Sequence, residues 1–139
     1  FGFSDVLTVF LAMDSYVELY KGGIIPLEQF AKMKKDNDIL VRLIVKKTPC
    51  KVVYTSMRNQ RTDFPVIACA VAQINGEYRA SIGARPARAM LLRSEQAEGF
   101  ASFVAENAPT EGNIRGSAAY RTHLTKVLVE RSLKELGGM

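Results

Sequence analysis

The stretch GNIRGSAAYRTHLTKVLVERSLKELGG, residues Gly112 to Gly138, ends the chain and predicts how it folds. Gly112 to Gly116 carries turn residues, and Ser117 is a favourable N-cap for a helix. Tyr120, Leu124, Val127 and Leu128 recur at helical spacing, so they share one face. Gly137-Gly138 is a typical stop. The stretch therefore predicts a turn followed by one long helix docked on a core by its apolar face.

Residues 49–111 predict an antiparallel sheet. Asn75-Gly76 lies between two β-prone runs and is the strongest hairpin signal in the chain, and Gly83 ends the second arm. The other expected elements are strands at 51–56, 64–74 and 88–92, a polar loop at 57–63, and a helix capped by Ser94 with Ala97, Phe100, Phe103 and Val104 on its apolar side. This order predicts an α+β fold, in which an antiparallel sheet of three to four strands packs against C-terminal helices.

The N-terminal third predicts a smaller α+β segment. Ser4 is a good N-cap, and Asp5 follows in the first turn of a short, largely buried helix that ends near Met13. Strands are expected at 16–20 and 39–45, with a Gly22-Gly23 turn and a brief helix from Pro26 between them. Thr48-Pro49 breaks the pattern. We therefore expect two units, residues 1–48 and residues 49–139.

Composition excludes several classes of protein. The chain has 139 residues, of which 47% are hydrophobic and 24% charged, as in a folded soluble protein. The longest apolar run, Val66 to Ala72, is too short to span a bilayer, and no signal-peptide pattern opens the chain. Two unclustered cysteines cannot form a disulfide framework or hold an iron–sulfur cluster, so a reduced, cytoplasmic setting is expected. Cys69 is expected in the core and Cys50 at the surface.

The net charge of +5 leaves two interpretations open. One is a nucleic-acid-binding domain, but the basic residues are dispersed and no aromatic-interleaved basic stripe or RNA-binding signature accompanies them. The other is a solvated face, or a surface that docks an acidic partner subunit. The chain also has no phosphate-binding GxGxxG or P-loop motif and no nucleophile–base–acid constellation. The residues alone therefore indicate an α+β domain without an assigned function.

A family resemblance gives a more specific hypothesis. SAAYR at 117–121 followed by VLVER at 127–131 resembles the end of the flavoprotein (FAD-binding) subunit of molybdenum hydroxylases, the xanthine dehydrogenase and carbon monoxide dehydrogenase group. Upstream, MRNQRTD at 57–63, RPARA at 85–89, FSDVL at 3–7 and DILVRLIVK at 38–46 resemble further segments of the same subunit. The resemblance implies that residues 49–139 are its C-terminal domain, and residues 1–48 the tail of its FAD-binding domain.

The resemblance also implies cofactor-binding residues. Asp5 matches an aspartate that hydrogen-bonds FAD near its ribityl or pyrophosphate part, and Leu40 matches an aliphatic residue beside the isoalloxazine ring. Thr55, after Tyr54, falls where many relatives carry a lysine near the flavin. Arg58, together with Arg61, lies in the loop that would supply a positive charge instead. Tyr120 and Arg121 are expected to be structural, the ring in the core and the guanidinium on loop carbonyls or a carboxylate.

The implied function is electron transfer in a xanthine/purine dehydrogenase-like enzyme. Substrate would be oxidised at a molybdopterin on one partner subunit, and electrons would pass through iron–sulfur clusters on another to FAD, then to NAD or another acceptor. Partners would thus be the molybdopterin-binding and iron–sulfur subunits, with no nucleic acid and no membrane. No Gly-rich loop that would grip the pyrophosphate is present. The chain is therefore expected to be a fragment of a larger flavoprotein, inactive alone and able to pair with a second copy. The alternative is a non-catalytic docking module.

Overall fold

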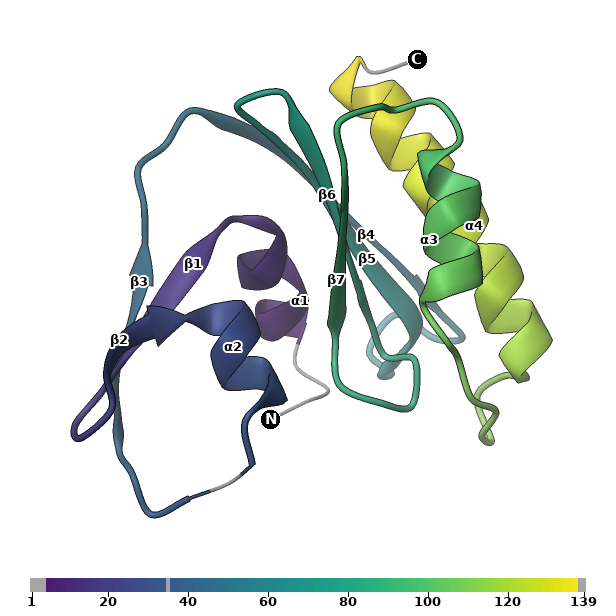
Figure 1. Ribbon diagram of the computed structural model, residues 1–139. Helices are drawn as coiled ribbons and strands as arrows, with labels where there is room; N and C mark the ends of the chain where they lie inside the picture. Colours follow the sequence, from purple (N-terminus) through teal and green to yellow (C-terminus); the bar gives the residue numbers. More distant parts are fainter. Residues whose placement is uncertain (1–4, 35, 138–139) are drawn as a thin grey trace.

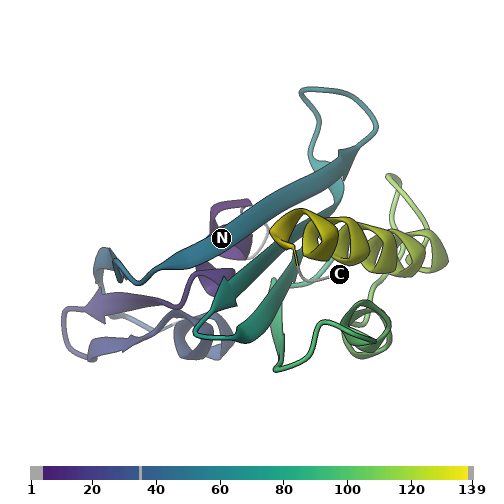
Figure 2. The same cartoon turned by 90° about the horizontal axis from the view of Figure 1, so that it is seen from above.

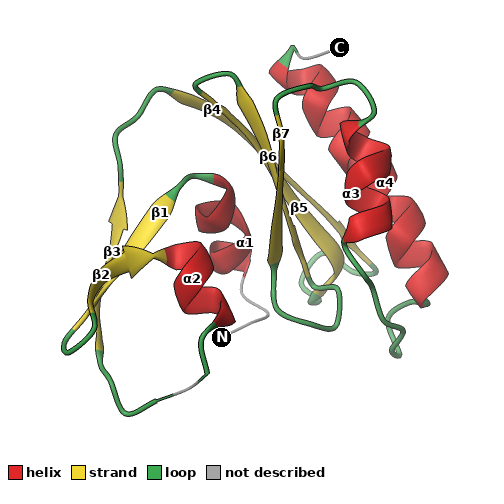
Figure 3. Cartoon of the chain, viewed as in Figure 1, coloured by secondary structure: helices red, strands yellow, loops and turns green. Residues whose placement is uncertain are grey.

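The structure, a computed structural model, describes residues 5–34 and 36–137, so the expected cap Ser4 and the stop residue Gly138 lie outside it. Within these ranges the chain forms four layers (Figure 1). A three-stranded sheet lies on one side, and α1 and α2 separate it from a four-stranded sheet. Helices α3 and α4 cover the far face of that second sheet (Figure 3). The predicted α+β fold, an antiparallel sheet packed against C-terminal helices, is confirmed.

The first sheet has three strands and is built from residues 15–45. Strand β1 (Ser15–Leu19) lies between β2 (Gly23–Pro26) and β3 (Leu40–Val45), and both pairings are antiparallel. Helix α2 (Leu27–Lys32) follows β2 directly. Strand β2 was not predicted, because its glycine and proline weaken the β signal of its two isoleucines.

The second sheet has the order β4-β5-β6-β7, all antiparallel. Its strands are β4 (Cys50–Arg58), β5 (Pro65–Ile74), β6 (Glu77–Gly83) and β7 (Met90–Ser94). The predicted hairpin is confirmed: Ile74 pairs with Glu77 across Asn75 and Gly76, whose φ angles are 51° and 86°. Positive φ at both positions is what a tight two-residue hairpin turn requires. Strand β4 extends to Arg58, two residues into the predicted loop.

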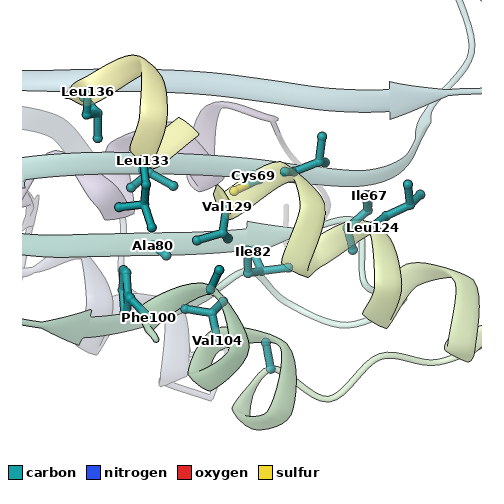
Figure 4. Close-up of a cluster of buried hydrophobic side chains, with 14 of the residues drawn as sticks. Ile67, Cys69, Ala80, Ile82, Phe100, Val104, Leu124, Val129, Leu133 and Leu136 are labelled. Atoms are coloured by element: carbon teal, nitrogen blue, oxygen red, sulfur yellow. The ribbon is translucent and has the colours of Figure 1, made fainter. Parts of the chain in front are cut away.

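Nearly all of β5 is buried, because helices cover both faces of the sheet. On one face Ile67, Cys69 and Val71 pack against α3 (Phe100–Asn107) and α4 (Ala118–Leu136), as the close-up in Figure 4 shows for part of this cluster. On the other face Ala70 and Ala72 pack against Ala12 at the end of α1 (Asp5–Ala12). The side chains of β5 therefore alternate between two separate clusters.

Three details of the predicted helices are wrong. Helix α3 begins after Gly99, which has a φ of 73°, whereas Ser94 ends β7 and its hydroxyl accepts a hydrogen bond from the amide of Gln96. Phe103 and Tyr120, both expected on buried faces, are 44% and 45% exposed. On α4 the buried face instead begins with Arg121 and continues through Leu124, Leu128 and Leu133. Ser117 does cap α4, accepting a hydrogen bond from the Tyr120 amide.

Among the described residues the two sheets share no strand pairing, and the chain passes from the first to the second between Val45, where β3 ends, and Cys50, where β4 begins (Figure 2). Helix α1 belongs to the N-terminal segment but packs against β5 and β6 of the second sheet. The predicted division at residues 48 and 49 thus coincides with the gap between the sheets, and whether each segment is an independent domain stays a prediction. Among the described residues, no helix is long and apolar enough to cross a membrane.

Candidate functional site

A polar cluster joins the start of α1 to the end of β4. The Arg58 guanidinium donates from Nη2 to Asp5 Oδ2 at 2.8 Å and from Nη1 to the carbonyl oxygen of Asp63 at 2.7 Å. Its Nε donates to Ser56 Oγ at 3.2 Å. The Arg58 side chain is 27% exposed and that of Asp5 42%. The cluster is therefore ordered by charge-assisted hydrogen bonds and still reaches solvent.

Tyr54 belongs to the same cluster because it lies on the same face of β4 as Ser56 and Arg58. Burial raises the pKa of its phenol, and the negative charge of Asp5 and a hydrogen bond to Asp5 raise that pKa further. The hydrogen bond to Asp5 likewise raises the pKa of Arg58. The phenol therefore stays protonated and neutral at physiological pH, while Asp5 and Arg58 form a charged pair.

An open apolar concavity of about 820 Å³ has Val6, the residue that follows Asp5 in the chain, in its wall. Its walls are the inner sides of α1, β1, α2 and β3, with Ala87 and Arg88 from the loop before β7. The apolar side chains of the wall are Val6, Leu7, Phe10, Val17, Leu19, Leu27, Phe30, Ala31, Met33, Leu40 and Leu43, and Lys34, Asp36 and Asp38 stand among them. A concavity of this volume, mostly apolar with a few polar groups, is typical of a small-molecule or cofactor site.

Arg88 holds one wall of the concavity in place. Its Nη1 donates to the carbonyl oxygens of Ala31 and Met33 at 2.8 and 3.0 Å, which lie at the C-terminal end of α2. A cation at this end of a helix satisfies carbonyls that have no partner within the helix. The second sheet therefore positions α2, although α2 belongs to the N-terminal segment.

The structure brings three of the four predicted site residues to one side of the second sheet. Asp5 and Arg58 are bonded, and Leu40 is a wall residue of the neighbouring concavity and is 50% exposed. Thr55 lies on the opposite face of β4, where it is the register partner of Cys69. Its Oγ1 is buried and has no hydrogen-bond partner of ordinary geometry. It lies near the Cys69 thiol, whose pKa it lowers against the larger, opposite effect of burial. Arg61, the other predicted arginine, is exposed in the loop after β4.

Two contributors, Tyr54 and Arg88, were not among the predicted cofactor-binding residues. The role of Tyr54 follows from the period-two alternation Tyr54, Ser56, Arg58, once β4 is extended to Arg58. The role of Arg88 has no local sequence signal, since its acceptors lie 57 and 55 positions away. The part of the chain that the structure describes contains no group of three or more His, Cys, Asp or Glu side chains able to hold a metal ion. The arrangement thus combines an apolar concavity with a nearby group of hydrogen-bonding side chains.

No protein-family profile and no curated protein matches this sequence. Solved structures do match. A chain of quinoline 2-oxidoreductase from Pseudomonas putida 86 superimposes with a TM-score of 0.74 at 17% identity, covering 99% of this chain and 58% of that one. A chain of carbon monoxide dehydrogenase from Hydrogenophaga pseudoflava, in a form lacking the Mo-pyranopterin moiety of the molybdenum cofactor, gives 0.76 at 18% identity, with 96% and 56% covered. Reconstituted CO dehydrogenase from Oligotropha carboxidovorans gives 0.76 at 15%, with the same coverage.

The chain thus spans a little over half the length of the solved chains that it matches. The match extends over both sheets and all four described helices, because at least 96% of this chain is aligned. The chain therefore has the fold found in chains of carbon monoxide dehydrogenase and quinoline 2-oxidoreductase.

Proposed function

We propose that this chain is the C-terminal part of the FAD-binding subunit of a molybdenum hydroxylase. Residues 1–48 would close the FAD-binding domain, and residues 49–139 would be the C-terminal domain. The observation that carries the proposal is the fold shared, over almost the whole chain, with enzymes named carbon monoxide dehydrogenase and quinoline 2-oxidoreductase. The motifs SAAYR at 117–121 and VLVER at 127–131 support it independently of the fold.

The apolar concavity fits the ring system of FAD. Aromatic and aliphatic side chains from α1, α2 and β3 line it, and Leu40 and Leu43 extend its wall along β3. Removing a flat aromatic ring from water against such a wall is favourable at roughly 25 cal/mol per Å² of apolar surface. Leu40 and Phe10 would thus hold the ring by contact, and bound FAD would supply the redox chemistry of the subunit.

The polar cluster fits the hydroxyl-bearing part of the cofactor. Asp5 has one carboxylate oxygen bonded to Arg58, and its side chain remains 42% exposed, so it keeps acceptor capacity for hydroxyl groups. A carboxylate is a poor neighbour for phosphate, which favours the ribityl chain over the pyrophosphate as its partner. Thr55 lies on the opposite face of β4, so its predicted part in cofactor binding is not used in this proposal.

The pyrophosphate has no corresponding cradle among the described residues. Backbone amides of a Gly-rich loop or nest usually hold such a group, and no motif of that kind occurs in the sequence. We assign that anchor to a longer polypeptide of which this chain is the C-terminal part, so the 139 residues alone would bind FAD weakly and lack activity.

The wider reaction follows from the same proposal. Substrate would be oxidised at a molybdopterin on a partner subunit, and electrons would reach this subunit through iron–sulfur clusters on another and leave to NAD or another acceptor. The xanthine/purine branch and a cytoplasmic setting are parts of the proposal that rest on the sequence resemblance alone.

The test is the cofactor content of the protein purified from its natural source. The proposal predicts about one FAD per copy of this chain, together with molybdenum and iron in stoichiometric amounts on co-purifying subunits. A preparation with neither flavin nor molybdenum, at full yield of the chain, contradicts it. That result would favour the alternative of a non-catalytic docking module.

A further inference from the structure

Four charged side chains stand in the wall of the concavity: Lys34, Asp36, Asp38 and Arg88. Both carboxylate oxygens of Asp38 accept backbone amides, and an oxygen of Asp36 accepts the amide of Asp38. Lys34 is exposed and has no hydrogen-bond partner among residues 5–34 and 36–137. Arg88 is thus the one cation of the described wall that hydrogen bonds hold in a fixed place.

The Arg88 guanidinium is held by only one of its three nitrogens. Nη1 donates to the carbonyl oxygens of Ala31 and Met33, which are neutral acceptors. In the part of the chain that the structure describes, Nη2 and Nε have no acceptor, and no carboxylate lies within ion-pair distance. Arg88 is also exposed. Its positive charge is therefore neither paired nor buried, and its remaining N–H groups are free to donate to a ligand in the concavity.

The loop that carries Arg88 is held on both sides. Arg85 Nε donates to the carbonyl oxygen of Arg88 at 2.9 Å, and Arg85 Nη1 to that of Pro109 at 2.6 Å. Ala89 is 8% exposed and belongs to the apolar cluster beneath the first sheet. Ala84 begins the loop with a φ of 56°, a conformation that a non-glycine residue keeps only when its surroundings impose it. The charge of Arg88 therefore has little freedom to leave the wall.

The two arginines that the sequence offered as a source of positive charge do not line the concavity. Arg58 is paired with Asp5, and Arg61 is exposed in the loop after β4. A volume of about 820 Å³ corresponds to a cube about 9 Å on a side, which is shorter than the roughly 10 Å over which salt screens charges at 0.1 M. A ring bound in the concavity thus lies within the field of Arg88.

We propose that Arg88 determines the charge preference of this site, holding a ring with a negatively charged polar edge more tightly than the same ring when neutral. Under the function proposed above, on which this identification rests, the ring is that of FAD. Two electrons and one proton convert the oxidised ring into a reduced ring with one net negative charge. The electrons come from the iron–sulfur clusters of the partner subunit and the proton from water. Arg88 therefore favours reduced over oxidised FAD, because a fixed guanidinium forms its strongest hydrogen bonds with anionic acceptors.

The experiment compares three variants of the longest natural polypeptide that contains this chain, loaded with FAD. Arg88→Gln removes the charge and keeps an amide that can donate to the carbonyls of α2, whereas Arg88→Lys keeps the charge. Arg93→Gln is the matched control, because Arg93 also holds α2, through Glu28, but is not in the wall of the concavity. The reduction potential of the bound flavin is titrated with dithionite against a reference dye. The dissociation constant of oxidised FAD is measured by fluorescence.

We expect Arg88→Gln to weaken binding of reduced FAD at least tenfold relative to oxidised FAD, which lowers the two-electron potential by about 30 mV. Arg88→Lys and Arg93→Gln should stay within threefold, or about 14 mV. Equal weakening of both forms by Arg88→Gln, or an equal shift with Arg93→Gln, overturns the inference and leaves the flavin site intact. A shift with Arg88→Lys as large as with Arg88→Gln overturns the assignment to charge. A wild-type polypeptide that binds no FAD contradicts the proposed function itself, and this inference with it.

Discussion

Asp5 Oδ2 accepts a hydrogen bond of 2.8 Å from Arg58 Nη2, although the two residues are 53 positions apart. This bond links the first turn of α1 to the last residue of β4 and hence the N-terminal segment to the second sheet. Both residues were candidates from sequence, but for separate contacts with a cofactor. Their pairing shows that the candidate site exists only when α1 is docked on the second sheet.

Replacing Asp5 by asparagine should lower the pKa of Tyr54. The substitution removes a negative charge that, after burial, is the strongest cause of the raised phenol pKa. Ultraviolet titration of the phenolate, with Tyr54→Phe identifying the signal, should show Tyr54 ionising at a lower pH. Because the pair is partly exposed, the loss of stability should be only about 0.5 kcal/mol. Glu135→Gln, at an exposed position on α4, is the control, and an unchanged Tyr54 titration in Asp5→Asn would refute the assigned contact.

Replacing Arg121 by lysine should destabilise the fold strongly. A single ammonium cannot reach all four acceptors that the guanidinium fork satisfies, and each buried polar group left unpaired costs about 1–3 kcal/mol. We expect a loss of at least about 2 kcal/mol in the free energy of unfolding, measured by urea denaturation. Arg131→Lys, at an exposed position of the same helix, should change it by less than about 0.5 kcal/mol. Equal effects of the two substitutions would contradict the anchoring role of Arg121.

Alanine at Gly83 should displace α1. An added Cβ would lie 2.0 Å from Thr8 Oγ1 and 3.2 Å from Thr8 Cβ, and Thr8 is 1% exposed. Overpacking of this kind costs about 1–3 kcal/mol. Thr8→Ala removes the closest atom, so the double variant Gly83→Ala/Thr8→Ala should lose less stability than the sum of the single variants. Strict additivity in a thermal-unfolding cycle would show that α1 does not pack this closely against β6.

The two thiols should differ sharply in reactivity. Cys50 is exposed, whereas Cys69 is buried and burial raises its pKa to about 12. At pH 8 a thiol reagent should label one cysteine per folded chain rapidly, and the label should map to Cys50.

The raised pKa of Cys69 also contributes to the free energy of unfolding. This contribution is complete below the unfolded pKa near 9 and is lost as pH rises towards 12. Wild type should therefore lose more stability than Cys69→Ala over that interval; rapid double labelling would contradict the burial.

Local signals in the sequence predicted most of the second sheet and the helices that cover it. The Asn75-Gly76 hairpin, the Ser117 cap and the Gly137 stop depend on residues adjacent in sequence, and all three were found where expected. The wrong predictions concern features that are set by contacts between segments distant in the sequence. Periodicity placed Tyr120 on the buried face of α4, but the rotation of α4 is set by Arg121, whose acceptors include a carbonyl of β5.

The candidate site was predictable only in part. Asp5 and Arg58, which the resemblance named for separate cofactor contacts, form an ion pair with each other, whereas Thr55 turns towards the helices because successive residues of a strand face opposite sides. The positions that shape the concavity, such as Arg88, depend on pairs of segments more than 50 residues apart. No local pattern specifies such pairs.

The most direct test of the whole account is an equilibrium titration with FAD, followed by flavin fluorescence. It should be made on the 139-residue chain and on the longest natural polypeptide that contains it, with Leu40→Asp and Thr55→Val in the latter. We predict stoichiometric binding by the longer polypeptide, at least tenfold weaker binding by the 139-residue chain and by Leu40→Asp, and affinity within twofold of wild type for Thr55→Val. If neither wild-type polypeptide binds FAD, or if Leu40→Asp binds as tightly as wild type, the flavin site proposed here is wrong.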